Sequence, residues 1–267
     1  PENCRWSVEP EKTVLEIAPG MEAQQAFKVS LKDASAGMFP LPVLNSTILL
    51  DNEKVLNVSE RLPVKPLEPP AKPVAEGTRA ASGITVDGAL SDKAWSACVP
   101  ATGFVLPHYD GQPEYQTEVR FAYDDEYLYL GARCFDKAPE KTAVNQKERD
   151  SEVWKDDSLE FLLDARMDQA AFHHFIVNAK GVVYDALNVD KKWDCPVSAA
   201  ASSEENAWTL ELAVPWKSLG ITNPAAGLKM GLELARNKAG KPKEVSQWSP
   251  TFGGNQQPDS FVTLVIR

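Results

Sequence analysis

The residues best suited to chemistry lie in the segment from Glu152 to Asp164, which begins as an acidic loop and continues as a strand. The loop contains one large aromatic residue, Trp154, whose indole offers a flat apolar surface for a sugar ring. Glu160 follows in the strand, and its carboxylate can accept hydrogen bonds from sugar hydroxyls. The pair suits a carbohydrate site. It also fits an ordinary sheet edge, where Trp154 packs against a neighbour and Glu160 is a solvated carboxylate.

The strand pattern tells which way Glu160 points. Leu159, Phe161 and Leu163 alternate with Ser158, Glu160, Leu162 and Asp164. A period of two places the first set on one face and the second set on the other. We therefore predict a strand over 158–164 with its apolar set in the core and Glu160 on the outer face.

Side-chain amides supply the other candidate ligands for a sugar. Asn178 ends an expected strand over 172–178, where it can contact a ligand or cap the turn to Gly181. Asn255 and Gln256, with Gln257 beside them, lie in a polar loop over 252–259 and can hydrogen-bond hydroxyl groups. The alternative for this loop is a solvated surface segment without a ligand.

Catalytic and metal-binding patterns are weak in this sequence. Asp156, Asp157 and Glu160 form only a nominal carboxylate pair, and no nucleophile elbow, phosphate loop or HExxH motif occurs. We expect no hydrolytic activity from the chain itself. Asp150, Asp156 and Asp157 can hold Ca²⁺, although they lack the fixed spacing of an EF-hand. No other cofactor and no metal site is predicted.

Charge and composition limit the classes of molecule that the chain can bind. The chain of 267 residues carries a formal net charge of −10, which disfavours nucleic acids and anionic membranes as partners. No apolar run reaches the ~18–20 residues of a membrane-spanning helix. We expect a monomer that binds a polysaccharide or oligosaccharide. The first residues, Pro1 to Cys4, lack a methionine, and we interpret the chain as a piece of a longer, secreted, cell-surface or periplasmic polypeptide.

The four cysteines do not define a metal or redox motif. None lies in a CxxC pair. Cys134 is in register with Leu128, Leu130 and Ala132, which predicts a core position. A disulfide between Cys98 and Cys134 is the one pairing considered.

The chain divides into an all-β domain over 1–62, a linker over 63–76 and a larger domain over 77–267. Five prolines between Leu62 and Ala75 predict a stiff, extended connector. Short alternating segments predict a small immunoglobulin-like β-sandwich before it, with strands over 14–17, 23–31, 46–50 and 54–58.

The larger domain is predicted to be an antiparallel β-sandwich because short alternating segments are separated by turn residues. We expect strands over 84–86, 117–123, 127–135, 158–164, 172–178, 182–187, 208–214, 228–235, 245–248 and 261–266, with helical turns near 91–95 and 216–219. Trp95, Trp208 and Trp216 are expected to pack in the core.

The larger domain resembles carbohydrate-binding module family 9. The resemblance rests on four ordered matches over about 190 residues: 86–95, 123–129, 154–161, and 208–219 with Trp248 and the closing segment to Phe261. It implies an antiparallel β-sandwich that binds sugars without cutting them. Relatives of this sandwich in the wider superfamily bind haem b through a histidine and a methionine. His173, His174 and Met230 are available, but His173 shares a face with Phe175 and is expected in the core.

The resemblance also implies a partial set of ligand residues. Family members that bind glucans and xylans clamp a terminal sugar between two tryptophans. Trp154 falls on the first tryptophan, Glu160 on a sugar-contacting carboxylate and Asn178 on a sugar-contacting asparagine. The family's arginine is Ile176 here, and the loop from Phe252 to Asp259 lacks the second tryptophan.

The sequence thus predicts a non-catalytic carbohydrate-binding module in a larger secreted, polysaccharide-degrading protein. The alternative is a structural spacer or protein-docking sandwich that has lost its sugar site.

Overall fold

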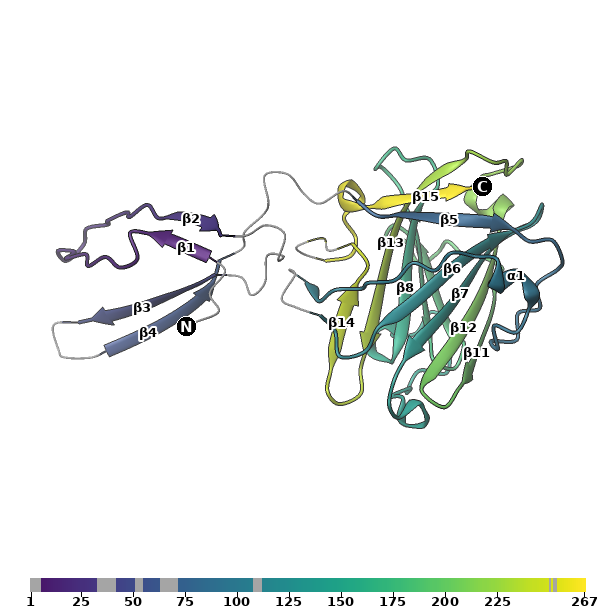
Figure 1. The fold of residues 1–267 in the computed structure, drawn as a ribbon, viewed down its shortest axis with the longest axis horizontal. Coiled ribbons are helices and arrows are strands. Elements are labelled where there is room, and N and C mark those ends of the chain that lie inside the picture. Colours follow the sequence, from purple (N-terminus) through teal and green to yellow (C-terminus); the bar gives the residue numbers. More distant parts are fainter. Residues whose placement is uncertain are drawn as a thin grey trace. The chain divides into compact units, whose positions relative to one another are not determined.

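A computed structural model describes residues 6–32, 42–50, 55–62, 72–107, 112–249, 251 and 254–267. The chain divides into two compact units, drawn in Figure 1. The first comprises residues 1–67 with 109–111, and the second comprises 68–108 with 112–267.

The first unit contains two antiparallel hairpins. β1 (Trp6–Glu9) pairs with β2 (Lys28–Leu31), and β3 (Val43–Leu49) pairs with β4 (Val55–Arg61). The strand predicted over 14–17 is wrong, and β1 was not predicted because its four residues show little alternation. The immunoglobulin-like sandwich stays a prediction for this unit.

The second unit contains one continuous sheet of eleven strands in the order β10-β9-β8-β13-β15-β5-β6-β7-β12-β11, with β14 paired to β13. The strands are β5 (Val74–Arg79), β6 (Thr117–Tyr123), β7 (Tyr127–Phe135), β8 (Ser158–Asp164), β9 (His173–Asn178), β10 (Val183–Leu187), β11 (Ser198–Ser203), β12 (Ala207–Pro215), β13 (Lys229–Lys238), β14 (Glu244–Gln247) and β15 (Val262–Ile266). The all-β sandwich expected for this domain is confirmed.

The sheet folds over into two layers. β8, β9, β10 and β13 form one layer, β6, β7, β11 and β12 form the other, and β5 and β15 connect them (Figure 1). β5 pairs in parallel with both β15 and β6, so the sheet is not wholly antiparallel as predicted. Parallel neighbours need a long connection, and residues 80–116 supply one between β5 and β6.

Short helices terminate several strands and loops. Those among the described residues are α1 (Lys93–Ser96) and the 3₁₀ turns η3 (Pro139–Lys141), η4 (Val153–Lys155), η5 (Trp216–Leu219) and η6 (Pro258–Ser260). η5 starts after Pro215 and ends at Gly220 in the left-handed conformation, φ 73°, which glycine adopts without strain.

The core lies between the two layers and follows the predicted alternation. Leu159, Phe161 and Leu163 of β8 all belong to it, and Phe161 stacks on Phe175 of β9 with ring centroids 5.0 Å apart. Trp208 and Trp216 are also in this cluster, and Trp95 is buried in a smaller one, as expected. The inner face of β8 is therefore fully used for packing, which leaves its outer face for a site.

Several details differ from the sequence prediction. β5 starts at Val74, so residues 74–76 belong to the sheet and not to the linker. β11 was missed because its Ser-Ala-Ala-Ala-Ser-Ser sequence has no apolar alternation, and 84–86 form no strand. Cys98 and Cys134 are free and lie in different clusters, so the disulfide considered between them is wrong; Cys134 is in the core as predicted.

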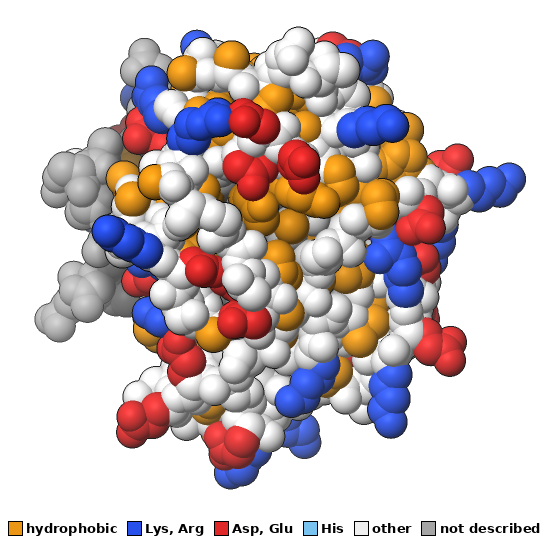
Figure 2. Space-filling model, turned by 90° about the vertical axis from the view of Figure 1, so that its right-hand side faces the viewer, with side chains coloured by type: hydrophobic (Ala, Val, Ile, Leu, Met, Phe, Trp, Pro, Cys, Tyr) orange, Lys and Arg blue, Asp and Glu red, His pale blue; other side chains and the backbone are white. Residues whose placement is uncertain are grey.

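Charge is distributed over the surface. Figure 2 shows one face of the second unit, on which acidic and basic side chains are interspersed and apolar side chains are exposed between them. Among the described residues, no helix is long and apolar enough to cross a membrane.

Candidate functional site

A pocket of about 590 Å³ opens on the outer face of β8, β9 and β10. Its floor is a row of three cross-strand neighbours, because Ile176 of β9 faces Glu160 of β8 on one side and Tyr184 of β10 on the other. His174 precedes Ile176 on the same face of β9. The lining is Trp154, Glu160, His174, Ile176, Tyr184, Gly254, Asn255, Gln256 and Gln257.

Trp154 forms the aromatic wall of the pocket. It lies in η4, is 38% exposed, and meets Tyr184 edge to face with ring centroids 5.3 Å apart and an interplanar angle of 84°. The Asn237 side chain donates hydrogen bonds to the backbone carbonyls of Trp154 (2.8 Å) and Asp156 (2.7 Å). The indole is thus exposed while its backbone is held to β13.

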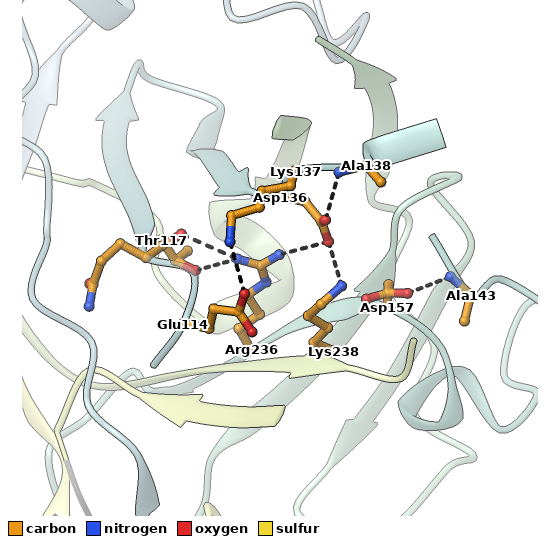
Figure 3. A network of polar contacts seen from close by, with 10 residues as sticks. Glu114, Thr117, Asp136, Lys137, Ala138, Ala143, Asp157, Arg236 and Lys238 are labelled. Atoms are coloured by element: carbon orange, nitrogen blue, oxygen red, sulfur yellow. Dashed lines mark hydrogen bonds and ion pairs between the residues drawn. The ribbon is translucent and has the colours of Figure 1, made fainter. Parts of the chain in front are cut away.

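The loop that carries Trp154 is anchored by a buried network of charged groups, drawn in Figure 3. The Lys238 ammonium donates to Asp136 over 2.6 Å, and the Asp157 carboxylate accepts a short hydrogen bond from the Ala143 N–H. Arg236 lies 3.9 Å from Asp136 and donates to the carbonyl of Gln116 over 3.2 Å.

The surroundings shift the pKa values of the Asp136 and Asp157 carboxyl groups in opposite directions. Burial raises the pKa of Asp157, whereas for Asp136 the hydrogen bonds from Lys238 and Ala138 outweigh burial and lower the pKa. Two carboxylates and two cations at this position fix both ends of the loop over 136–157.

Asp156 and Asn178 hold the middle of the same loop. The two Asp156 oxygens accept the backbone N–H groups of Asn145 and Gln146, each at 2.9 Å, and Asn178 donates to Asp156 over 3.0 Å. The side-chain oxygen Oδ1 of Asn178 accepts the backbone N–H groups of Lys180 and Val182, so Asn178 also caps the turn. Asn178 is fully buried and is not part of the pocket lining, which corrects its expected place as a ligand contact.

A chain of hydrogen bonds forms the polar end of the pocket. His174 Nε2 lies 2.7 Å from Glu160 Oε1, and Asn255 donates to Glu160 Oε2 over 2.7 Å. Gln247 of β14 makes a short hydrogen bond to the Asn255 carbonyl oxygen. This chain, Gln247–Asn255–Glu160–His174, ties the loop over 254–257 to the sheet. Each Glu160 oxygen retains a further lone-pair direction for a hydroxyl donor.

A second carboxyl group lies close to Glu160 but outside the pocket lining. Glu233 of β13 faces Leu162, two residues along β8 from Glu160, and is fully buried. Neither of its oxygens has a hydrogen-bond partner among the described residues. Burial raises the pKa of Glu233 well above its ordinary value, and the charge of Glu160 adds to this effect.

Neither calcium nor haem fits the side chains in this region. Both Asp156 oxygens and one Asp157 oxygen accept backbone N–H groups, and Asp150 accepts the N–H of Asp185. Within the described parts of the chain, no three candidate ligands converge as a metal site. Met230 is buried in the core and His174 faces the pocket with Glu160, so these two candidates for haem lie on opposite faces of the sheet.

Sequence reasoning proposed Trp154, Glu160, Asn255 and Gln256, with Gln257 beside them, and all five line the pocket. The structure adds His174, Ile176, Tyr184 and Gly254 to the lining. His174 could have been found because it shares the outer face of its strand with Ile176. Tyr184 required the register across the turn at 179–181, which sets it opposite Ile176. No second tryptophan is among the described lining residues; the loop contributes Gly254, Asn255, Gln256 and Gln257.

An all-β sandwich with an aromatic and amide-lined pocket on its outer face defines a binding module of the β-sandwich class. The sequence pattern of the family described as carbohydrate family 9 binding domain-like matches residues 86–266, and the chain belongs to this family. A search of curated proteins returned no match.

Solved structures show the same fold. A family 9 carbohydrate-binding module from Caldicellulosiruptor kristjanssonii in complex with cellotriose is 17% identical, with a TM-score of 0.55 over 73% of this chain and 94% of that one. A family 9 module from the same organism in complex with glucose is 17% identical, with a TM-score of 0.54 over 73% of this chain and 96% of that one. A protein from Bacteroides uniformis, provisionally assigned as carbohydrate-binding, is 13% identical, with a TM-score of 0.60 over 74% of this chain and 100% of that one.

Proposed function

We propose that the second unit binds a saccharide in the pocket between Trp154 and Asn255 and does not cleave it. The observation that carries the proposal is the exposed indole of Trp154 beside the hydrogen-bonded carboxylate of Glu160. A sugar ring stacked on the indole would place its hydroxyls toward Glu160 and the amides. Family membership and the saccharides bound in the two Caldicellulosiruptor complexes support this assignment.

A binding role also suits the acidic groups of the pocket. Glu160 is the one carboxylate in the described lining, and both of its oxygens already accept hydrogen bonds. Glycoside hydrolysis by the usual route needs two carboxyl groups that flank the bond. Glu233 is buried beneath the outer surface and does not provide the second.

We further propose that the unit is an accessory module of a larger secreted, polysaccharide-degrading protein, located outside the cell, at its surface or in the periplasm. The separate compact unit and the proline-rich segment before it support this arrangement. Detection of the native protein in culture supernatant, periplasm and cytoplasm by antibody tests the location; a purely cytoplasmic signal contradicts it.

Saccharide binding is tested by a glycan array followed by calorimetry on the full chain. We expect Trp154→Ala to weaken binding at least about tenfold, because a stacked aromatic wall is lost. Met167→Ala is the matched control, since it removes another exposed apolar side chain from a different loop. Equal thermal unfolding of both variants excludes misfolding.

The second candidate is a spacer or docking sandwich without a ligand, and the missing second tryptophan favours it. The two candidates give opposite results in the same experiment. If no saccharide on the array binds, or if Trp154→Ala binds like the wild type, the carbohydrate proposal is wrong.

A further inference from the structure

The aromatic end of the pocket carries an unpaired cation, Lys191. Its ammonium nitrogen lies 4.9 Å from the ring centroid of Trp154 and 5.2 Å from that of Tyr184. Both distances are within the range of cation–π attraction, which holds the ammonium group beside these two pocket residues. Lys191 is exposed and forms no ion pair with the described residues.

The backbone fixes where this ammonium group can reach. A tight turn at Asn188 and Val189 reverses the chain after β10, and Leu187 and Asp190 exchange hydrogen bonds across it. Lys191 therefore lies beside β10, the outermost strand of the sheet.

The next residues anchor the segment. Trp193 packs against His173 and Phe175 with centroids 5.0 and 5.8 Å apart, and the N–H of Cys195 donates to Asp185 over 2.7 Å.

Three of the acidic residues near this edge share one cation, Arg149, and a fourth, Asp190, directly precedes Lys191 in the chain. Arg149 pairs with Asp150 (3.7 Å), with Asp194 (2.8 Å) and with the buried Asp185. Glu160, at the opposite end of the pocket, accepts from His174 and Asn255. The pocket thus presents acceptors and amides at one end, and the Lys191 ammonium, which has no ion-pair partner among the described residues, lies beside the two aromatic residues at the other end.

We propose that Lys191 makes the pocket selective for a sugar that carries a carboxylate, a uronic acid residue. This inference rests on the proposed saccharide binding. The sugar ring stacks on Trp154, its hydroxyls meet Glu160 and the amides of the loop, and its carboxylate pairs with the ammonium of Lys191. A neutral sugar of the same shape gains the stacking and hydroxyl contacts but leaves Lys191 unpaired.

The experiment compares sugars that differ only at C6, where a hydroxymethyl group is replaced by a carboxylate: glucose with glucuronate, and galactose with galacturonate. We expect the acidic member of a pair to bind about two- to fivefold more tightly, the range for an ion pair that is exposed to solvent. The preference should fall in high salt, which screens a partly exposed pair.

Two variants identify the source of the preference. Lys191→Met keeps an apolar stem on the rings and removes the charge, so the preference should fall to about one while neutral sugars bind as before. Lys192→Met removes the same charge from the exposed neighbouring residue and should leave the preference intact.

The outcomes distinguish a failure of the Lys191 role from a failure of saccharide binding itself. Neutral sugars that bind as tightly as uronates, or a preference that persists in Lys191→Met, would overturn the role of Lys191 and leave saccharide binding standing. If neither member of any pair binds, and the glycan array is also blank, the proposed function fails together with this inference.

Discussion

Replacing the buried Glu233 by methionine should stabilise the second unit, and more so at high pH. The wild-type carboxyl group is fully buried and neither oxygen has a hydrogen-bond partner among the described residues. Burying a polar group without a partner costs about 1–3 kcal/mol. Methionine has a similar length and no such group, so Glu233→Met should gain about that amount where the carboxyl is protonated in both states.

The pH dependence adds to this gain. In the unfolded chain a glutamate titrates near a pKa of about 4.3, whereas the folded protein holds the Glu233 proton to higher pH because burial and Glu160 raise the pKa. The folded state then binds more protons than the unfolded state. The contribution of Glu233 to the free energy of unfolding is therefore largest below the pKa of the unfolded chain. It falls by about 1.4 kcal/mol per pH unit above that value, until the pH passes the pKa of the folded protein.

The assay is urea unfolding followed by tryptophan fluorescence at several pH values upward from the pKa of an unfolded glutamate, about 4.3. Trp6 is the one tryptophan outside the second unit, so the signal reports mainly on that unit. Glu205→Met removes the same charge from an exposed turn and should change stability by less than about 0.5 kcal/mol. A Glu233→Met variant no more stable than the wild type, or a gain that does not grow with pH, would refute the reasoning.

Three further predictions follow from single contacts. Glu211→Ala should lower the free energy of unfolding in urea by about 3 kcal/mol. Glu211 accepts hydrogen bonds from Trp95 Nε1 (2.7 Å) and from the N–H groups of Asp87 and Gly88, and all three donors would lose their acceptor. An unchanged unfolding midpoint would contradict this. Gly88→Ala should cost about 2 kcal/mol or more, since φ is +83° and a Cβ would lie 2.7 Å from the Ala201 backbone; Gly103→Ala, with a similar φ and open space, should cost less. Asn255→Ala should weaken saccharide binding about three- to tenfold in calorimetry while the melting temperature barely changes, because the loop over 254–257 loses its tie to Glu160; unaltered affinity would show that the tie is unimportant.

Much of the fold follows from local sequence because the strands are amphipathic and their turns carry the expected residues. The bounds predicted for β6, β7 and β8 agree with the structure residue for residue. β11 was invisible because alanine and serine do not differ enough in polarity to show a period. The parallel pairing of β5 depends on contacts between the two ends of the unit, which no local pattern encodes.

The site was predictable only as far as one strand and its loop. Trp154 and Glu160 are close in sequence, so a loop followed by a strand brings them together. Asn178 obeys the predicted alternation, but the loop that carries Asp156 covers it, and the sequence does not tell which outer-face residues are covered. Lys191 reaches the pocket through two successive turns, so its position depends on their register.

The pairing of β5 with β15 has a mechanical consequence. The two strands run in parallel, Arg267 donates its N–H to Gly77, and Arg267 pairs with Glu76 at 2.8 Å. Tension applied between the residues before Val74 and those at Arg267 pulls the strands along their length in opposite directions. The hydrogen bonds between them are then loaded together in shear and do not open one at a time. The second unit should therefore resist tension between these two points better than tension that peels an edge strand off the sheet.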